Sequence, residues 1–202
     1  MRKNIGGIMG RLKNWMLYKC FKKEFDMVME DYNNQLIKKK KRMEEVIAEK
    51  TAVLDLVRLA LTDNFDVIGE GDNKTGEHVV VAKRIGKSDT FGASIDFFLY
   101  GKSYKGISRH PKIMATYKEP INQEPYVHID DILVMDDNQG NGSILMPYFI
   151  EYCKTTKARY INGQLSSVDK DHFDRSIHFY KKHGFEVTLA ESGESGSIKY
   201  IL

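Results

Sequence analysis

The chain has 202 residues, 42% of them hydrophobic, which is enough for one ordinary domain with a core plus an appendage. Its formal net charge of +3 argues neither for nor against nucleic acid. No stretch reaches the roughly 18 to 20 uncharged apolar residues of a membrane span, and the N-terminus lacks the apolar core of a signal peptide. Cys20 and Cys153 have no metal-ligand spacing, and they fit a reducing compartment better than a disulfide framework. We therefore expect a cytoplasmic protein without a metal site.

The composition changes near Asn64, which predicts a helical arm over residues 1–62 and a domain over residues 63–202. Residues 1–23 place apolar side chains at helical spacing among many basic ones. Such a helix can lie on an anionic membrane surface or grip a partner. A helix packed on its own domain, with a solvated basic face, is the interpretation that we favour for residues 1–23.

Residues 24–62 contain neither Pro nor Gly, which predicts a long helix or a helical hairpin. Lys39 and Lys50 interrupt an apolar seven-residue register, so the pattern departs from a strict coiled coil, although a homodimer stays open. The last turns, Val53 to Leu61, are expected to dock on the domain. The basic run Lys38 to Arg42 is interpreted as a solvated face and not as a nucleic-acid site. The register consists of Phe25, Met29, Tyr32, Leu36, Met43, Val46, Val53, Val57 and Ala60.

The region after the arm changes to short strand patterns separated by turn residues. A turn rich in Gly, Asp and Asn covers residues 69–76, and residues 86–89 read as a hairpin connection. Residues 101–125 hold three of the four prolines, and we predict a long functional loop there. The predicted strands are Phe65 to Ile68, His78 to Ile85 and Phe91 to Tyr100.

The C-terminal half alternates between strand and helix patterns. Gly184 follows the second helix as a C-terminal glycine of the expected type. This order predicts an α/β (α+β) fold in which helices flank a central mixed sheet. The predicted strands are 126–135, 158–165, 185–189 and 197–202, and the predicted helices are 144–156 and 170–183.

A Gly-rich turn, Asp136 to Ser143, lies between a predicted strand and a predicted helix. Such a turn leaves backbone N–H groups free at a helix N-terminus, where the helix dipole also favours negative charge. The sequence therefore indicates a phosphate-bearing cofactor.

The segment Ile132 to Leu145 around this turn resembles the acyl-CoA-binding motif of the GNAT superfamily of N-acetyltransferases. That motif is Gln or Arg, two residues, Gly, one residue, then Gly or Ala. In one register Gln139 and Gly142 match, and Ile144 stands where Gly or Ala is usual. In the other register Gly140 pairs with Gly142, and Asp137 takes the basic or amide position. An acidic side chain beside a pyrophosphate is unfavourable, so we prefer the Gln139 register.

A second segment, Ser176 to Phe185, resembles the last motif of the same family, and the resemblance covers about residues 65–202. Tyr180 matches the tyrosine that lies near the cofactor sulfur in many relatives. Ser176 stands for the usual Ala, and Phe173 stands where Asn is common.

The resemblance implies direct transfer of an acetyl (acyl) group from acetyl-CoA to a small-molecule or peptide amine. Tyr180 is then the candidate acid, Asp130 the first candidate base and His128 the second. Two other functions stay open: an acyl-CoA-binding protein without catalysis, which the Ile144 and Phe173 departures keep open, and an interaction protein that acts through the basic arm. The implied cofactor-binding residues are Leu133, Val134, Gln139, Gly140, Asn141, Gly142, Ser143, Ile144 and Ser176.

Overall fold

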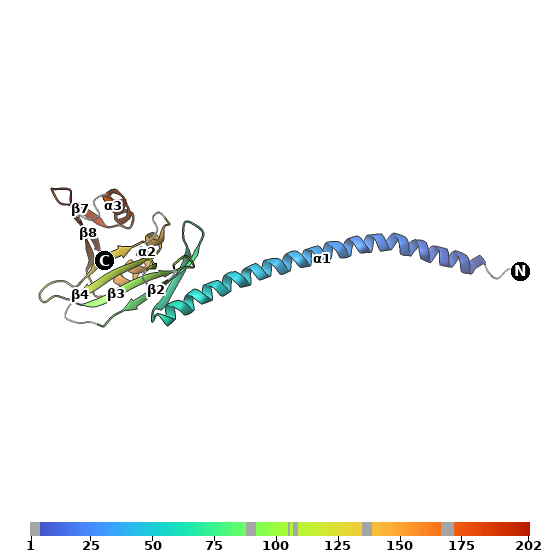
Figure 1. Cartoon of the computed structure of the whole chain (residues 1–202), viewed down its shortest axis with the longest axis horizontal. Coiled ribbons are helices and arrows are strands. Elements are labelled where there is room, and N and C mark those ends of the chain that lie inside the picture. Colours follow the sequence, from blue (N-terminus) through green and yellow to red (C-terminus); the bar gives the residue numbers. More distant parts are fainter. Residues whose placement is uncertain (1–4, 88–91, 105, 107–108, 135–138, 167–171) are drawn as a thin grey trace. The chain divides into compact units, whose positions relative to one another are not determined.

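The structure is a computed structural model that describes residues 5–87, 92–104, 106, 109–134, 139–166 and 172–202 (Figure 1). The chain divides into two compact units, Met1–Thr51 and Ala52–Leu202. The boundary falls before the last turns of the first helix, which the sequence predicted to dock on the domain. Within the described residues, no helix is both long enough and apolar enough to cross a membrane.

The first element, α1, is one α-helix that runs from Ile5 to Thr62. The predicted alternative of a helical hairpin is wrong, since the helix is continuous. No Gly or Pro occurs between Arg11 and Thr62 that could break it.

The second unit is built on one eight-stranded sheet with the order β1-β2-β3-β4-β5-β6-β8-β7 (Figure 1). All neighbouring strands are antiparallel except β5 and β6, which are parallel. The predicted fold class, a mixed sheet flanked by helices with an N-terminal helical arm, is confirmed. The strands are Asp66–Asp72, His78–Ile85, Ala93–Tyr100, Lys112–Lys118, Tyr126–Leu133, Tyr160–Leu165, Glu186–Leu189 and Gly196–Ile201, and the further helices are α2 (Asn141–Lys154) and α3 (Phe173–Lys182).

Two predicted turn regions are strands in the structure. The predicted loop 101–125 contains β4, which pairs with β3 and β5 in the interior of the sheet. The prolines of this region flank β4 and do not interrupt it, so they remove no hydrogen bond from the ladder. The predicted turn 69–76 begins only after Asp72, because β1 continues through Gly69 to Asp72. The register of β1 against β2 shifts after Val67.

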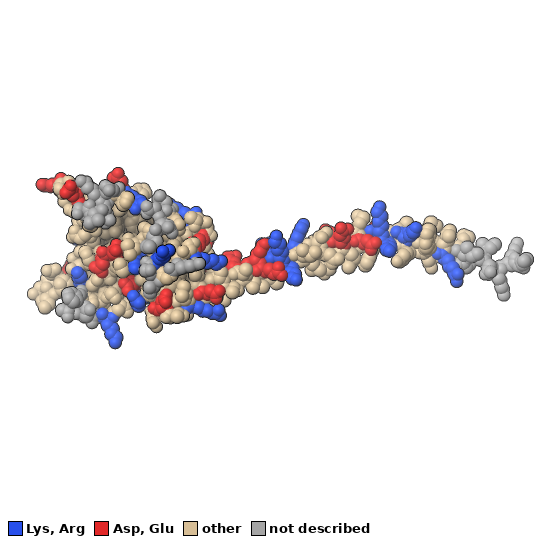
Figure 2. All heavy atoms as spheres, in the orientation of Figure 1, with Lys and Arg blue, Asp and Glu red and all other residues tan. Residues whose placement is uncertain are grey.

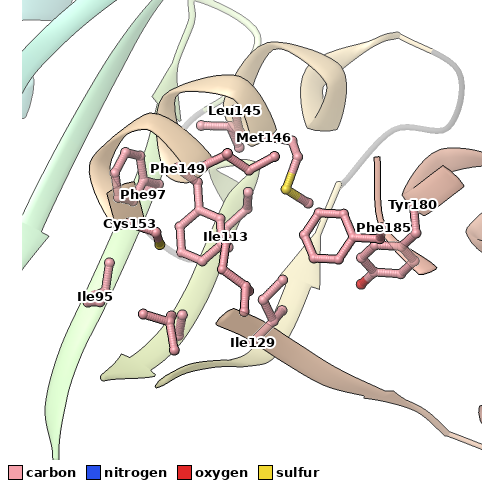
Figure 3. Packing of buried hydrophobic residues seen from close by; sticks show 14 of the residues in the cluster. Ile95, Phe97, Ile113, Ile129, Leu145, Met146, Phe149, Cys153, Tyr180 and Phe185 are labelled. Carbon is pink, nitrogen blue, oxygen red and sulfur yellow. The ribbon is translucent and has the colours of Figure 1, made fainter. Parts of the chain in front are cut away.

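The strand β2 shows how helices cover both faces of the sheet. Val79 and Val81 belong to the larger core cluster, in which the α2 residues Leu145, Met146 and Phe149 are buried (Figure 3). Val80 and Ala82 point to the opposite face, and they join a second buried cluster. Successive side chains of a strand alternate between faces, so a strand covered on both faces is apolar throughout.

The second cluster contains the last turns of α1. Leu56 and Ala60 are buried against Phe65, Phe98 and Tyr100, and Val53 and Val57 pack beside them half-buried. The docking predicted for Val53 to Leu61 is therefore present. The predicted domain division between residues 62 and 63 stays a prediction.

One pH-dependent feature joins the first two strands of the sheet. The ring atom Nδ1 of His78 lies 2.8 Å from Asp72 Oδ1, and Nε2 lies 3.2 Å from Glu70 Oε2, so the protonated imidazole donates to both carboxylates. The hydrogen bond to Asp72 is the main cause that raises the pKa of His78 above 6.5, and Glu70 adds to it against the opposing effect of burial. A raised pKa in the folded state stabilises the protein below pH 6.5.

We therefore expect the stabilising effect of His78 to disappear as pH rises through its folded-state pKa. The measurement is urea unfolding of the wild-type protein and of His78→Gln at about pH 5.5 and 8.5, either side of the ordinary histidine pKa. The difference in free energy of unfolding should be larger at the lower pH. A difference that grows with pH would contradict the assignment.

Candidate active site

The parallel strands β5 and β6 separate beyond Ile129. Their pairing runs from Tyr126 opposite Tyr160 to Ile129 opposite Gly163 and then ends. The β4–β5 register shifts between Met114 and Ala115, so Asp130 is an extra residue in β5, that is, a β-bulge. A bulge interrupts the alternation that puts successive side chains of a strand on opposite faces, and both Asp130 and Asp131 line the same cavity.

The cavity between the separated strands has a volume of about 530 Å³. The end of β5, the end of β6, the N-terminus of α2 and one side of α3 form its walls. Of the residues predicted to bind the cofactor, all but Gln139 and Ile144 line it: Leu133, Val134, Gly140, Asn141, Gly142, Ser143 and Ser176. The candidate catalytic residues Tyr180 and Asp130 line it too.

The N-terminus of α2 faces this cavity without a side-chain cap. Gly140 holds the N-cap position with φ of 81°, a left-handed conformation that glycine adopts at little cost. A Cβ on Gly142 would lie 3.1 Å from Phe179 Cε2 and 3.3 Å from Val134 Cγ1. Glycine is therefore the residue that lets α3 and the end of β5 approach the first turn of the helix closely.

Gln139 does not line the cavity, but its side chain helps to hold the Gly-rich turn in place. Its side-chain Oε1 accepts a hydrogen bond from the Tyr104 hydroxyl at 3.2 Å. The same hydroxyl accepts from Asn141 Nδ2 at 2.6 Å, and the buried Asn141 finds no partner for its Oδ1 among the residues that the structure describes. Ile144 is half-buried and packs on the larger core cluster. The residues of the alternative register, Asp137 included, lie outside the described residues.

The tyrosine in this network gives a prediction. We expect Tyr104→Phe to destabilise the fold by about 1–3 kcal/mol, because a buried amide loses a hydrogen-bond partner. We also expect weaker CoA binding, since the turn that holds the helix N-terminus loses its support. Tyr148→Phe is the matched control, because Tyr148 lies on α2 and its hydroxyl donates to the Glu70 carbonyl, at 3.3 Å, away from the Gln139–Asn141 network. Thermal melting and CoA titration of both variants test this, and equal behaviour would contradict it.

Basic side chains surround the helix N-terminus, and the sequence did not predict them. Lys74, Arg175 and Lys182 line the cavity. Lys182 Nζ donates to Ser143 Oγ at 3.2 Å. The side-chain Cγ of Lys74 lies 3.0 Å from the position that a Cβ on Gly140 would occupy. Lys74 lies in the β1–β2 turn, far from the motif in sequence, so only the fold brings it to the cavity.

The candidate acid Tyr180 is buried at the boundary between the cavity and the larger core. Its ring contacts Phe185 edge-on at a centroid distance of 5.5 Å (Figure 3). Tyr180 also makes a further bonding or ring interaction with another part of the protein. Cys153 is buried in the larger core, and burial raises the pKa of its thiol to about 12.

The two candidate bases differ in position. Asp130 is exposed in the cavity, where its Oδ2 accepts from Thr116 Oγ1 at 2.7 Å. His128 does not line the cavity, and its Nδ1–H donates to Asn162 Oδ1 at 2.8 Å. The positions therefore favour Asp130 over His128. Among the described residues, no group of three or more His, Cys, Asp or Glu is arranged to hold a metal ion.

The segment that contains most of this cavity matches a known family. Residues 103–185 match the model of the acetyltransferase (GNAT) family. The resemblance to GNAT acetyltransferases that the two motifs predicted is confirmed over this segment.

The chain is also similar to individual proteins. YocC, an uncharacterized protein of Bacillus subtilis (strain 168), is 36% identical over 89 residues, which are 44% of this chain and 50% of YocC. The match to the GNAT domain of S. lividans PAT covers 66% of this chain and 96% of that one, with a TM-score of 0.48 and 8% identity. The match to a GNAT acetyltransferase from Streptococcus pneumoniae covers 54% and 67%, with a TM-score of 0.41 and 15% identity.

The chain spans about half the length of the curated relative that it matches. The activity, the substrate and the partners of the protein are therefore proposals.

Proposed function

We propose that this protein is an N-acyltransferase that moves an acyl group, most simply acetyl, from acyl-CoA to an amine by direct transfer. The observation that carries the proposal is a cavity in which three features meet: an uncapped helix N-terminus, a strand edge that pairs with no described strand, and a buried tyrosine. The helix N-terminus suits the phosphates of an acyl-CoA, the strand edge suits its extended amide-containing chain, and the tyrosine suits its thioester.

The phosphates fit the first turn of α2. The backbone N–H groups of Asn141, Gly142 and Ser143 come from the turn whose N–H groups have no acceptor inside the helix. Lys74 and Lys182 add positive charge at the same place. A phosphate bound there accepts charge-assisted hydrogen bonds, which are stronger than neutral ones.

The extended amide-containing chain of the acyl-CoA fits the edge of β5 beyond Ile129. From there on β5 has no ladder to β6, while Leu133 and Val134 line the cavity. A chain of amide groups can pair with such an edge as an added strand does. A backbone N–H of the same edge that reaches the thioester carbonyl would stabilise the negative charge that develops on its oxygen.

The bound acyl-CoA supplies the acyl group as a thioester. In our proposal Asp130 accepts a proton from the attacking amine, directly or through water. Tyr180 donates its hydroxyl proton to the sulfur that leaves. The cavity walls hold the amine and the carbonyl carbon together, which replaces a bimolecular encounter by a positioned one.

Two assays on the full chain test the proposal. Calorimetric titration with acetyl-CoA measures binding, and a screen of small-molecule and peptide amines for thiol release measures turnover. Binding together with turnover is the expected result. Binding without turnover on every amine would indicate an acyl-CoA-binding protein that lacks catalysis. Absence of CoA binding would refute the proposed function.

A further inference from the structure

The described part of the first unit carries large apolar side chains that its own helix leaves exposed. Every described side chain from Met9 to Thr51 is exposed, and Trp15, Phe25 and Met43 are 55%, 62% and 66% exposed. Together with Tyr18, Met29, Tyr32, Leu36 and Val46, they occupy two positions of a seven-residue repeat. We call these eight residues the arm stripe. Such a row of apolar side chains forms one face of a helix.

The same two repeat positions are covered in the second unit. Val53, Val57 and Ala60 continue the arm stripe along α1, and there they pack against the unit's own strands. The apolar side chains at these repeat positions are therefore covered wherever another part of the protein packs against the helix. An exposed apolar surface of this length indicates a binding partner for the arm.

The charges of the arm occur in blocks of alternating sign (Figure 2). Residues 11–23 hold only basic charges, residues 24–31 only acidic ones, residues 38–42 only basic ones and residues 44–49 only acidic ones. A partner that lies along the arm stripe must match this order of signs.

We infer that the partner is the arm of a second copy, bound antiparallel and centred near Asn34. This alignment pairs Leu17 to Thr51 of one copy with Thr51 to Leu17 of the other. The acidic block 24–31 then lies opposite the basic block 38–42, twice by symmetry. Lys19, Lys22 and Lys23 face the region of Glu45 and Glu49. Opposite charges along a helix pair select both partner and orientation.

The alignment also accommodates the three lysines that fall at positions of the arm-stripe repeat. Lys22, Lys39 and Lys50 lie opposite Val46, Met29 and Tyr18, so each lysine meets a side chain on which its methylene stem can pack. A parallel pair in register would place Lys39 against Lys39 and the basic block 38–42 against itself. Such like-charge pairs in the seam are unfavourable, so the antiparallel pair is favoured.

The charge order also separates a second copy from an anionic membrane. A lipid surface presents one sign of charge along the whole arm, so it attracts the basic blocks 11–23 and 38–42 but repels the acidic blocks 24–31 and 44–49. In the antiparallel pair, the acidic block 24–31 faces residues 38–42, and the acidic block 44–49 faces Lys19, Lys22 and Lys23. The pairing makes no use of the acyl-CoA cavity, so it stands independently of the proposed function.

Solution mass is the first test. We expect light scattering of the full chain to give a dimer at low salt. The dissociation constant should rise several-fold between about 0.05 and 1 M NaCl, because salt screens exposed charge pairs. A monomer at all protein concentrations, or binding to phosphatidylserine vesicles by a protein that stays monomeric in solution, would overturn the proposal.

Disulfide trapping then tests the orientation. In a Cys20→Ser background, the antiparallel pair brings residue 25 of one copy beside residue 43 of the other. Mixing Phe25→Cys with Met43→Cys should give a heterodimeric disulfide that peptide mass spectrometry identifies. Each variant alone should link poorly, because its two thiols are about 27 Å apart along the pair, at 1.5 Å per residue. A parallel pair would give efficient disulfides in each variant alone, and this would contradict the proposal.

A charge exchange provides the matched control. Reversal of Lys38, Lys40 and Lys41 to Glu should give a monomer, as should reversal of Glu24, Asp26 and Glu30 to Lys. A mixture of the two variants should dimerise again, because every block regains an opposite partner. This recovery also shows that each variant arm still folds. Continued dimerisation of either variant alone, or failure of the mixture to dimerise, would contradict the antiparallel pairing of the arms.

Discussion

Replacement of Gly142 by Val should lower CoA affinity by roughly 100-fold or more, to the limit of detection by calorimetry. The added methyl groups would enter the space between Phe179 and Val134, where even a Cβ is 3.1 and 3.3 Å from its neighbours. Two or three charge-assisted hydrogen bonds of about 1.5–3 kcal/mol each would be lost or weakened, and every 1.4 kcal/mol corresponds to about a factor of ten.

The matched control for this variant is Gly71→Val. A Cβ on Gly71 meets only Ile144 Cγ2, at 3.9 Å, and a strand tolerates a β-branched residue. The control should bind CoA like the wild-type protein, and circular dichroism should show that both variants are folded. Wild-type affinity in a folded Gly142→Val protein would mean that the phosphates do not bind at the N-terminus of α2.

For Tyr180→Phe we expect the chemical step to slow by about 100- to 10,000-fold, the usual worth of general acid catalysis. The ring should keep its contact with Phe185, so acetyl-CoA binding should change little. An interaction made mainly in the transition state lowers kcat and kcat/KM together. Steady-state kinetics with an accepted amine, beside calorimetric titration of acetyl-CoA, measure the two quantities separately.

Tyr200→Phe controls for loss of a hydroxyl near the same core. The Tyr200 ring also packs against Phe185, at 5.2 Å, but Tyr200 does not line the cavity. The control should retain wild-type kcat. Full activity of Tyr180→Phe, with chemistry rate-limiting, would leave Tyr180 as a packing residue and would leave the acid unassigned.

The parts of the fold that the sequence predicted are those set by local patterns. The apolar run in β2 and the Gly-rich turn before α2 could be recognised because each signal lies within a few adjacent residues. The long helix α1 follows from its uniform composition. By contrast, β4 escaped prediction because prolines lie on both sides of it and the sequence around it is typical of a loop. Its burial comes from the neighbours β3 and β5, which only the fold supplies.

The candidate site divides in the same way. Gly142 and Tyr180 carry local motifs, and they line the cavity as the motifs imply. Lys74 and Tyr104 come from distant turns, so no spacing rule connects them with the helix N-terminus. The bulge at Asp130 depends on how β4 pairs with β5, and simple alternation along one strand cannot show it.

The insertion of β8 between β6 and β7 has a consequence for synthesis on the ribosome. Strands β1 to β5 neighbour each other in the order in which they are made, and β6 joins β5. The outer edge of β6 is then without its neighbour until residues 196–201 have been translated, since β8 is the strand that covers it. An uncovered edge is a template for pairing with other chains. A nascent chain that has passed Leu165 is therefore at its most aggregation-prone, and chaperone contact should concentrate in that interval of translation.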